Sequence, residues 1–235
     1  QLSAAQAQQH EWLTQVAHEL RTPLAGVRLH LEIMQKKGVE GSETLISRID
    51  LLMHTIEQLL MLARAGQNFA KGEYQQVDLI SNVVEPLREE LCEMLSERSQ
   101  NLKVHLPPRA EIQGDAVLLR LMVRNLVENA YRYGPENSDI TMTIVPKDNG
   151  FLIQIDDAGP GIDENKASEL TQAFKRMDQR YGGSGLGLNI VVRIAHLHGG
   201  ILTLRNRIDN AGLSAQCWLP DVALQNSLTL SPDAR

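Results

Sequence analysis

His18 lies next to Glu19 and one helical turn before Thr22, a spacing that suits chemistry at an imidazole ring. Glu19 could accept a proton from one ring nitrogen and leave the other nitrogen to act as a nucleophile. Thr22 would share the helical face of His18, where its hydroxyl could orient a water molecule. Pro23 follows and marks a distortion of the helix, of a kind often found at functional sites. The alternative interpretation is an ordinary exposed histidine.

A second polar segment, residues 125–133, places amide side chains along one helical face. Asn125, Asn129 and then Arg132 or Tyr133 recur at steps of four, three and four. Amide oxygens are hard ligands that suit Mg²⁺, and an arginine beside them suits phosphate. Because a solvated polar face would have the same spacing, this segment alone leaves both interpretations open.

Two glycine-containing segments follow. Asp157, Gly159 and Gly161 come directly after an expected strand, and the glycines let the backbone approach a ligand closely. Asp157 could accept a hydrogen bond from an exocyclic amine. The second segment, residues 182–188, opens a helix, where glycine-rich backbone typically binds phosphate. It lacks the Lys-Ser/Thr of a Walker A loop and the preceding strand of a Rossmann fingerprint. The alternative for the Asp157 segment is a bare turn, and the alternative for residues 182–188 is a flexible hinge.

The elements that must position these residues begin with a helical hairpin over residues 1–66. In its second half apolar residues recur at alternating steps of four and three, which is typical of a helix packed along another helix. These residues are Leu45, Ile49, Leu52, Ile56, Leu59 and Ala63. We expect the turn of the hairpin at residues 38–42 and a bend at Pro23. A lone hairpin buries little apolar surface, so we predict a dimeric four-helix bundle through residues 1–65. The alternative is a hairpin packed on the rest of its own chain.

Residues 77–220 alternate between strand and helix patterns, after a predicted linker at 67–76 and before a tail at 221–235. We expect strands at 76–79, 102–106, 110–114, 140–145, 151–156, 201–206 and 215–219, and helices at 80–99, 115–133 and 186–198. Asp115 is a candidate helix cap, residues 147–150 a hairpin turn, and residues 199–200 a helix stop. This mixture predicts a two-layer α/β sandwich.

Composition narrows the class of protein. Of the 235 residues, 43% are hydrophobic and 22% are charged, which excludes wholesale disorder. The net charge of −6 disfavours a nonspecific nucleic-acid or anionic-membrane binder. Cys92 and Cys217 lie far apart, unlike a disulfide scaffold or a CxxC zinc site. No stretch reaches the roughly 18 apolar residues of a membrane span, and residues 1–10 do not look like a secretory signal. We expect the chain to be part of a longer protein.

In order, the His18 segment, the Asn-rich helix, the Asp-x-Gly-x-Gly segment and the glycine-rich loop resemble the transmitter region of sensor histidine kinases. They match the H, N, G1 and G2 boxes of that family, and residues 174–177 resemble its F box. The resemblance covers residues from about 10 to 220. It implies a dimerisation and phosphotransfer bundle followed by an ATP-binding domain of the GHKL (Bergerat) type.

The resemblance also implies a role for each matched residue. His18 would be the phosphoacceptor, Glu19 its base, and Thr22 would position water for dephosphorylation of a partner. Asn129 would hold Mg²⁺, with Asn125 lining the same site. The remaining residues expected to bind ATP are Arg132, Tyr133, Asp157, Gly159, Gly161, Ile162, Arg176, Gly183, Gly185, Leu186 and Gly187.

Asp157 would bind the adenine amine, and Gly183, Gly185 and Gly187 would border the phosphates. Residues 163–184 would form a mobile lid. Two positions depart from the family pattern. Arg132 stands where lysine is common, which keeps the charge, and Met177 stands where an aromatic residue is common, which leaves the lid contacts open.

The activity implied is ATP-dependent autophosphorylation, with phosphotransfer to and dephosphorylation of a response regulator of the OmpR-like class. The chain would be a homodimeric cytoplasmic portion of a bacterial inner-membrane protein, reaching the membrane only through a missing N-terminal part and binding no nucleic acid. One alternative is an ATP-driven conformational clamp. Clamp relatives place a water-activating glutamate where this chain has Asn125, which disfavours that alternative. A non-enzymatic coiled-coil module is the other alternative, and failure to bind nucleotide would favour it.

Overall fold

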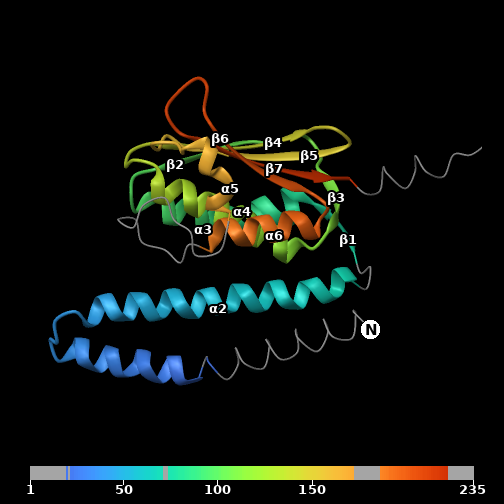
Figure 1. Ribbon diagram of the computed structural model, residues 1–235. Helices are drawn as coiled ribbons and strands as arrows, with labels where there is room; N and C mark the ends of the chain where they lie inside the picture. Colours follow the sequence, from blue (N-terminus) through green and yellow to red (C-terminus); the bar gives the residue numbers. More distant parts are fainter. Residues whose placement is uncertain (1–19, 21, 71–73, 172–185, 222–235) are drawn as a thin grey trace, which may run out of the picture. The chain divides into compact units, whose positions relative to one another are not determined.

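A computed structural model describes residues 20, 22–70, 74–171 and 186–221 (Figure 1). The chain divides into two compact units, residues 1–73 and 74–235. Within the described ranges, no helix combines the length and apolar composition that a membrane span requires.

The first unit is the predicted helical hairpin. A helix over residues 22–36 is followed by a turn and by α2 (Ser42–Ala70). Gly38 and Gly41 adopt positive φ angles of 74° and 82° in the turn, which explains why glycines occur there. The side chain of Arg28 donates to Asp50 Oδ1 at 2.5 Å and so links the two helices. We predicted that the hairpin ends at residue 66 and that a linker follows, and this was wrong for residues 67–70, which continue α2 because one glycine weakens a helix without ending it.

Many large apolar side chains of the hairpin are exposed in a single copy of the chain. They are Leu20, Val27, Leu29, Ile33, Met34, Val39, Leu45, Leu52 and Met61. Two of them, Leu45 and Leu52, belong to the predicted seam and expose 46% and 51% of their surface. So dense a set of exposed apolar residues is unusual for a free helix surface and is typical of an interface.

The second unit alternates strands and helices as predicted. Its elements are β1 (Gln75–Asp78), the π-helix η1 (Leu79–Val84), α3 (Glu85–Ser96), β2 (Asn101–His105), β3 (Glu111–Gly114), α4 (Ala116–Tyr133), β4 (Asp139–Pro146), β5 (Gly150–Asp156), the 3₁₀ helix η2 (Glu164–Lys166), α5 (Ala167–Leu170), α6 (Gly187–Leu197), β6 (Ile201–Asn206) and β7 (Leu213–Pro220).

A five-stranded sheet carries this unit, in the order β2-β4-β5-β7-β6. Only β2 and β4 pair in parallel, and the other neighbours are antiparallel. The helices α3, α4 and α6 lie on one side of the sheet, which gives the predicted two layers (Figure 1). Fully buried side chains such as Met122 on α4 and Ile153 on β5 fill the space between them. Alternating burial along β4 follows from this one-sided packing.

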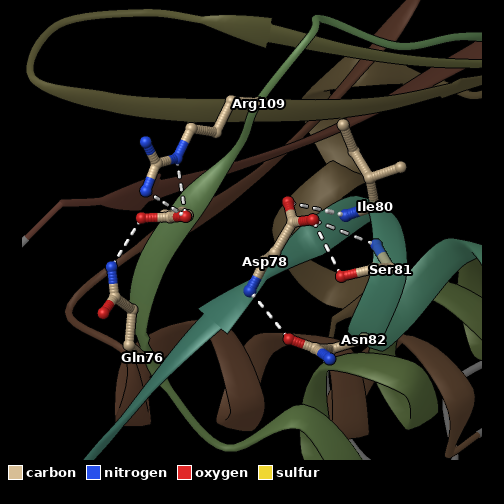
Figure 2. A network of polar contacts seen from close by, with 7 residues as sticks. Gln76, Asp78, Ile80, Ser81, Asn82 and Arg109 are labelled. Carbon is tan, nitrogen blue, oxygen red and sulfur yellow. Dashed lines mark hydrogen bonds and ion pairs between the residues drawn. The ribbon is translucent and has the colours of Figure 1, made fainter.

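A separate two-stranded sheet, β1 with β3, stands where the chain enters the second unit. Asp78 ends β1 and caps η1, since its carboxylate accepts hydrogen bonds from the backbone of Ile80 and Ser81 (Figure 2). On β3, Glu111 contacts both Arg109 and the side chain of Gln76. The single helix that we predicted over residues 80–99 is a π-helix, η1, followed by an α-helix, α3, that ends at Ser96.

Local signals for the ends of elements are confirmed. Asp115 Oδ1 accepts hydrogen bonds from the backbone of Val117 and Leu118, which caps α4. The backbone N–H of Lys147 donates to the carbonyl of Gly150 across the predicted hairpin turn. Gly199 has a φ of 71° just after α6, as expected for a helix stop.

Candidate functional site

The helices α4 and α6 meet where two asparagines of α4 face the first residue of α6. A Cβ added to Gly187 would lie 3.0 Å from Asn125 Oδ1 and 3.6 Å from Asn129 Nδ2. Asn125 is 3% exposed, and its amide nitrogen donates to the carbonyl of Leu121 at 2.8 Å. Asn125 is therefore buried at a helix contact, whereas Asn129, Arg132 and Tyr133 of the predicted polar face are partly exposed.

Asn129 carries a buried side-chain nitrogen that no hydrogen bond from the described residues reaches. A buried polar group without a partner is costly, so such a group marks a place where a ligand is expected. Among the described residues, no cluster of three or more His, Cys, Asp or Glu side chains could hold a metal ion. The unpartnered Asn129 nitrogen is an N–H donor, which suits a phosphate oxygen. The amide oxygens of Asn129 and Asn125 are the atoms that fit Mg²⁺, because this ion usually keeps waters and uses few protein ligands together with phosphates.

Asp157 lies directly after β5 with only 5% of its surface exposed. Its Oδ1 accepts hydrogen bonds from the backbone of Gly159 at 2.7 Å and Leu213 at 3.1 Å. No hydrogen bond from the described residues reaches Oδ2, so this oxygen can accept one from a ligand. Burial raises the pKa of Asp157, and the two backbone bonds and the charge of Arg207 oppose that shift. A buried acceptor of this kind suits an exocyclic amine.

The segment after Asp157 packs against the end of α4. A Cβ on Gly159 would lie 2.7 Å from the backbone oxygen of Tyr133, so only glycine lets the two backbones approach this closely. The end of α4 is held from the other side by Arg98, which donates to the carbonyl of Arg132 at 3.3 Å. Gln100 also donates to the carbonyl of Pro135 at 2.9 Å. Asp157, Gly159 and the end of α4 are thus one rigid arrangement.

Asn206, at the end of β6, is a residue that sequence reasoning missed. Its Oδ1 accepts from the backbone of Ile162 at 2.7 Å and its Nδ2 donates to the carbonyl of the same residue at 2.8 Å. Gly161 precedes with a φ of 74°, and a Cβ there would lie 2.4 Å from Asn206 Oδ1. Because 44 residues separate Asn206 from Ile162, no local pattern could indicate this pair.

The structure brings Asn125, Asn129 and Gly187 together at one point of α4, and Tyr133, Asp157 and Gly159 together at the end of α4. The other predicted residues of the second unit that the structure describes are Arg132, Gly161, Ile162 and Leu186. Thr22 lies exposed on the helix over residues 22–36 of the first unit. The other predictions fall outside the described residues, namely His18, Glu19, Arg176, Gly183, Gly185, the F box and most of the predicted lid.

Two family models match this chain. Residues 8–68 match the His Kinase A (phospho-acceptor) domain. Residues 114–223 match the histidine kinase-, DNA gyrase B- and HSP90-like ATPase family. The first match contains His18 and Thr22, and the second contains α4, Asp157 and Gly187. Both predicted domains are therefore recognised independently of the motif spacing.

The chain is similar to the sensor protein BasS of Escherichia coli K12, with 52% identity over 85% of this chain and 55% of that protein. It is 31% identical to the sensor protein kinase PmrB of Pseudomonas aeruginosa over 87% of this chain and 44% of that protein. The chain thus spans about half the length of these curated relatives. A solved mycobacterial sensor histidine kinase, MprB, matches 63% of this chain and 97% of its own with a TM-score of 0.57 and 25% identity. With both domains in the expected order and relatives of this kind, the chain belongs to the sensor histidine kinases and resembles the BasS and PmrB proteins.

Proposed function

We propose that this chain is an ATP-dependent protein-histidine kinase that phosphorylates His18. A ring nitrogen of His18 attacks the γ-phosphorus of ATP, so an N–P bond forms while the P–O bond to ADP breaks. Glu19 takes the proton from the imidazole. The position of His18 inside a matched phospho-acceptor domain supports this assignment.

The observation that carries the proposal is a pair of polar side chains in the second unit. Asp157 is buried and uses only Oδ1 for its two backbone bonds, which leaves Oδ2 for an adenine amine. Asn129 has a buried amide nitrogen beside Gly187 that no hydrogen bond from the described residues reaches. Mg²⁺ held by Asn129 and Asn125 would neutralise charge that develops on the transferring phosphoryl group. The glycines at 183, 185 and 187 would border the phosphates, and Arg132 and Tyr133 would contact the nucleotide.

The phosphoacceptor and the nucleotide site belong to different compact units, so transfer requires the connection between α2 and β1 to let them meet. We also propose that the hairpin dimerises into a four-helix bundle. The exposed seam residues Leu45 and Leu52 support this, because a second copy would cover them. A phosphohistidine then becomes the donor to an aspartate of a response regulator.

Incubation with γ-labelled ATP and Mg²⁺ tests the kinase activity. We expect an acid-labile label on the wild type and on His30→Gln, and none on His18→Gln. His30 is a matched control because it is an exposed histidine on the same hairpin, and its Nδ1 is hydrogen-bonded to the carbonyl of Gly26. A label that persists in His18→Gln would refute the proposal.

We propose further that Thr22 supports dephosphorylation of the regulator, which we expect to be of the OmpR-like class and of the PmrA type. Its exposure on the hairpin leaves the hydroxyl accessible to a docked regulator. We expect Thr22→Ala to keep autophosphorylation and to lose most of the dephosphorylation of such a regulator. Equal rates of regulator dephosphorylation by the variant and the wild type would contradict this role.

An ATP-driven clamp would need a general base at position 125. The buried amide of Asn125 donates to a carbonyl of its own helix and cannot take a proton from water. We therefore expect slow steady-state hydrolysis by a chain that forms phosphoprotein. Rapid hydrolysis without phosphoprotein would favour the clamp. In the cell we place this chain on the cytoplasmic side of the bacterial inner membrane, as part of a longer sensor.

A further inference from the structure

His198, the residue after α6, has both ring nitrogens engaged inside the second unit. His198 is buried, with only 4% of its surface exposed. Its Nε2 accepts a hydrogen bond from the backbone N–H of Asp115 at 3.1 Å, and its Nδ1 donates to the carbonyl of Ile194 at 2.8 Å. This pair of bonds requires a neutral ring with its proton on Nδ1. Burial lowers the pKa of His198, which favours that state.

The imidazole rests on the junction between β3 and α4. A Cβ added to Gly114, the last residue of β3, would lie 2.6 Å from Cδ2 and 2.8 Å from Nε2 of His198. Asp115 follows and caps α4 with its carboxylate. One side chain from the end of α6 therefore holds the residue at which α4 begins.

The same two helices meet at a second point, which is the candidate nucleotide site. There Gly187, at the start of α6, faces Asn125 and Asn129 on α4. The helices consequently run antiparallel, with His198 at one end of α6 and Gly187 at the other. The two ends of α6 are about 17 Å apart at about 1.5 Å per residue, and the matching stretch of α4 from Asp115 is about as long.

We propose that His198 is a positioning residue for the nucleotide site, because its bond to Asp115 fixes how far α6 slides along α4. The inference rests on the proposed nucleotide binding and adds a residue that does not touch the ligand. A shift of α6 would move Gly187 relative to Asn125, where even a Cβ on residue 187 would lie only 3.0 Å from Oδ1. Leu119 of α4, within 3.3 Å of the same Cβ position on Gly114, closes the junction from the side.

Substitutions at position 198 separate positioning from general stability. His198→Leu removes the acceptor for the Asp115 N–H, while His198→Gln places an amide oxygen near the position of Nε2. Leu91→Ala serves as the matched control, since Leu91 is a buried residue of α3, which contributes no residue to the proposed contacts between α4 and α6. All variants are compared at a temperature at which circular dichroism shows them folded.

The readout is the Kd of Mg·ADP by titration calorimetry on the full chain. We expect the Kd to rise about tenfold in His198→Leu, the size of a typical coupling between two sites. It should stay near the wild-type value in His198→Gln and Leu91→Ala. An unchanged Kd in His198→Leu, or an equal rise in Leu91→Ala, would overturn the proposal. Absence of binding by the wild type would instead count against the proposed function.

Hydrogen exchange on the unaltered chain keeps the inference testable if His198→Leu does not fold. Coupling between two sites is reciprocal, so bound nucleotide should stabilise the His198–Asp115 bond. We expect saturating Mg·ADP to slow exchange of the Asp115 amide measured by NMR. The amide of Leu91, buried in α3, should change less. An Asp115 amide that exchanges at the same rate with and without nucleotide would contradict the positioning role.

Discussion

Replacing Asp157 by asparagine should separate nucleotide recognition from folding. An asparagine oxygen can accept the same backbone hydrogen bonds from Gly159 and Leu213 that Oδ1 accepts now. The amide nitrogen would then stand at the position of Oδ2, where it faces an adenine amine donor to donor. The change therefore removes one ligand contact and leaves the surrounding backbone satisfied.

The magnitude follows from the charge and burial of Asp157. A hydrogen bond to a charged group contributes about 1.5 to 3 kcal/mol, so the Kd of Mg·ATP should rise about 10- to 150-fold. Stability should not fall in parallel. Burial raises the pKa of Asp157, so ionising this carboxyl in the folded chain lowers the free energy of unfolding. This loss of stability grows as the pH rises through the raised pKa. At neutral pH we expect the variant to be at least as stable as the wild type, and this advantage should shrink in acid.

Titration calorimetry with ATP and inosine triphosphate gives the sharpest assay. Inosine carries a carbonyl oxygen where adenine carries its amine, so the asparagine nitrogen can donate to inosine. We expect the wild type to prefer ATP and Asp157→Asn to lose that preference. Asp156→Asn, with the same change of charge one residue earlier, should retain it. A variant that still prefers ATP, or that loses binding only because it unfolds, would refute the reasoning.

Three further predictions concern other parts of the second unit. Burial raises the pKa of the Cys217 thiol to about 12, whereas Cys92 is exposed, so a thiol reagent at mildly alkaline pH should modify Cys92 rapidly and Cys217 only after denaturation; fast modification of both in the folded chain would contradict the structure. Asp115→Ala removes the cap of α4 and should lower the free energy of unfolding by about 1 kcal/mol, measured by urea titration; an unchanged midpoint would show that the cap contributes nothing. Gly187→Ala places a methyl group 3.0 Å from Asn125 Oδ1 and should weaken Mg·ADP binding about tenfold while the chain stays folded, and wild-type affinity would argue against that contact.

Features that depend on neighbouring residues could be predicted from the sequence. The cap at Asp115, the hairpin turn at residues 147–150 and the stop at Gly199 are set by local backbone chemistry, and each is confirmed. The two layers of the second unit follow from strand and helix periodicity in the same way. The asparagines of α4 could be selected because helical spacing places them on one face.

Features that depend on distant contacts could not be predicted. Asn125 is buried where α6 packs against α4. The hydrogen bonds between Asn206 and Ile162 join residues 44 positions apart. The parallel pairing of β2 with β4 is equally non-local, because strand patterns carry no information about order in the sheet. The π-helix at residues 79–84 differs from an α-helix only in its hydrogen-bond register, which apolar periodicity does not resolve.

Mapping the phosphoryl group by mass spectrometry tests the central claim most directly. The chain is incubated with Mg·ATP, digested at neutral to alkaline pH so that phosphohistidine survives, and each modified peptide is sequenced. Our account predicts a single phosphoryl group on His18. A phosphoryl group on a serine, threonine or other histidine, or release of ADP with no modified peptide, would contradict it.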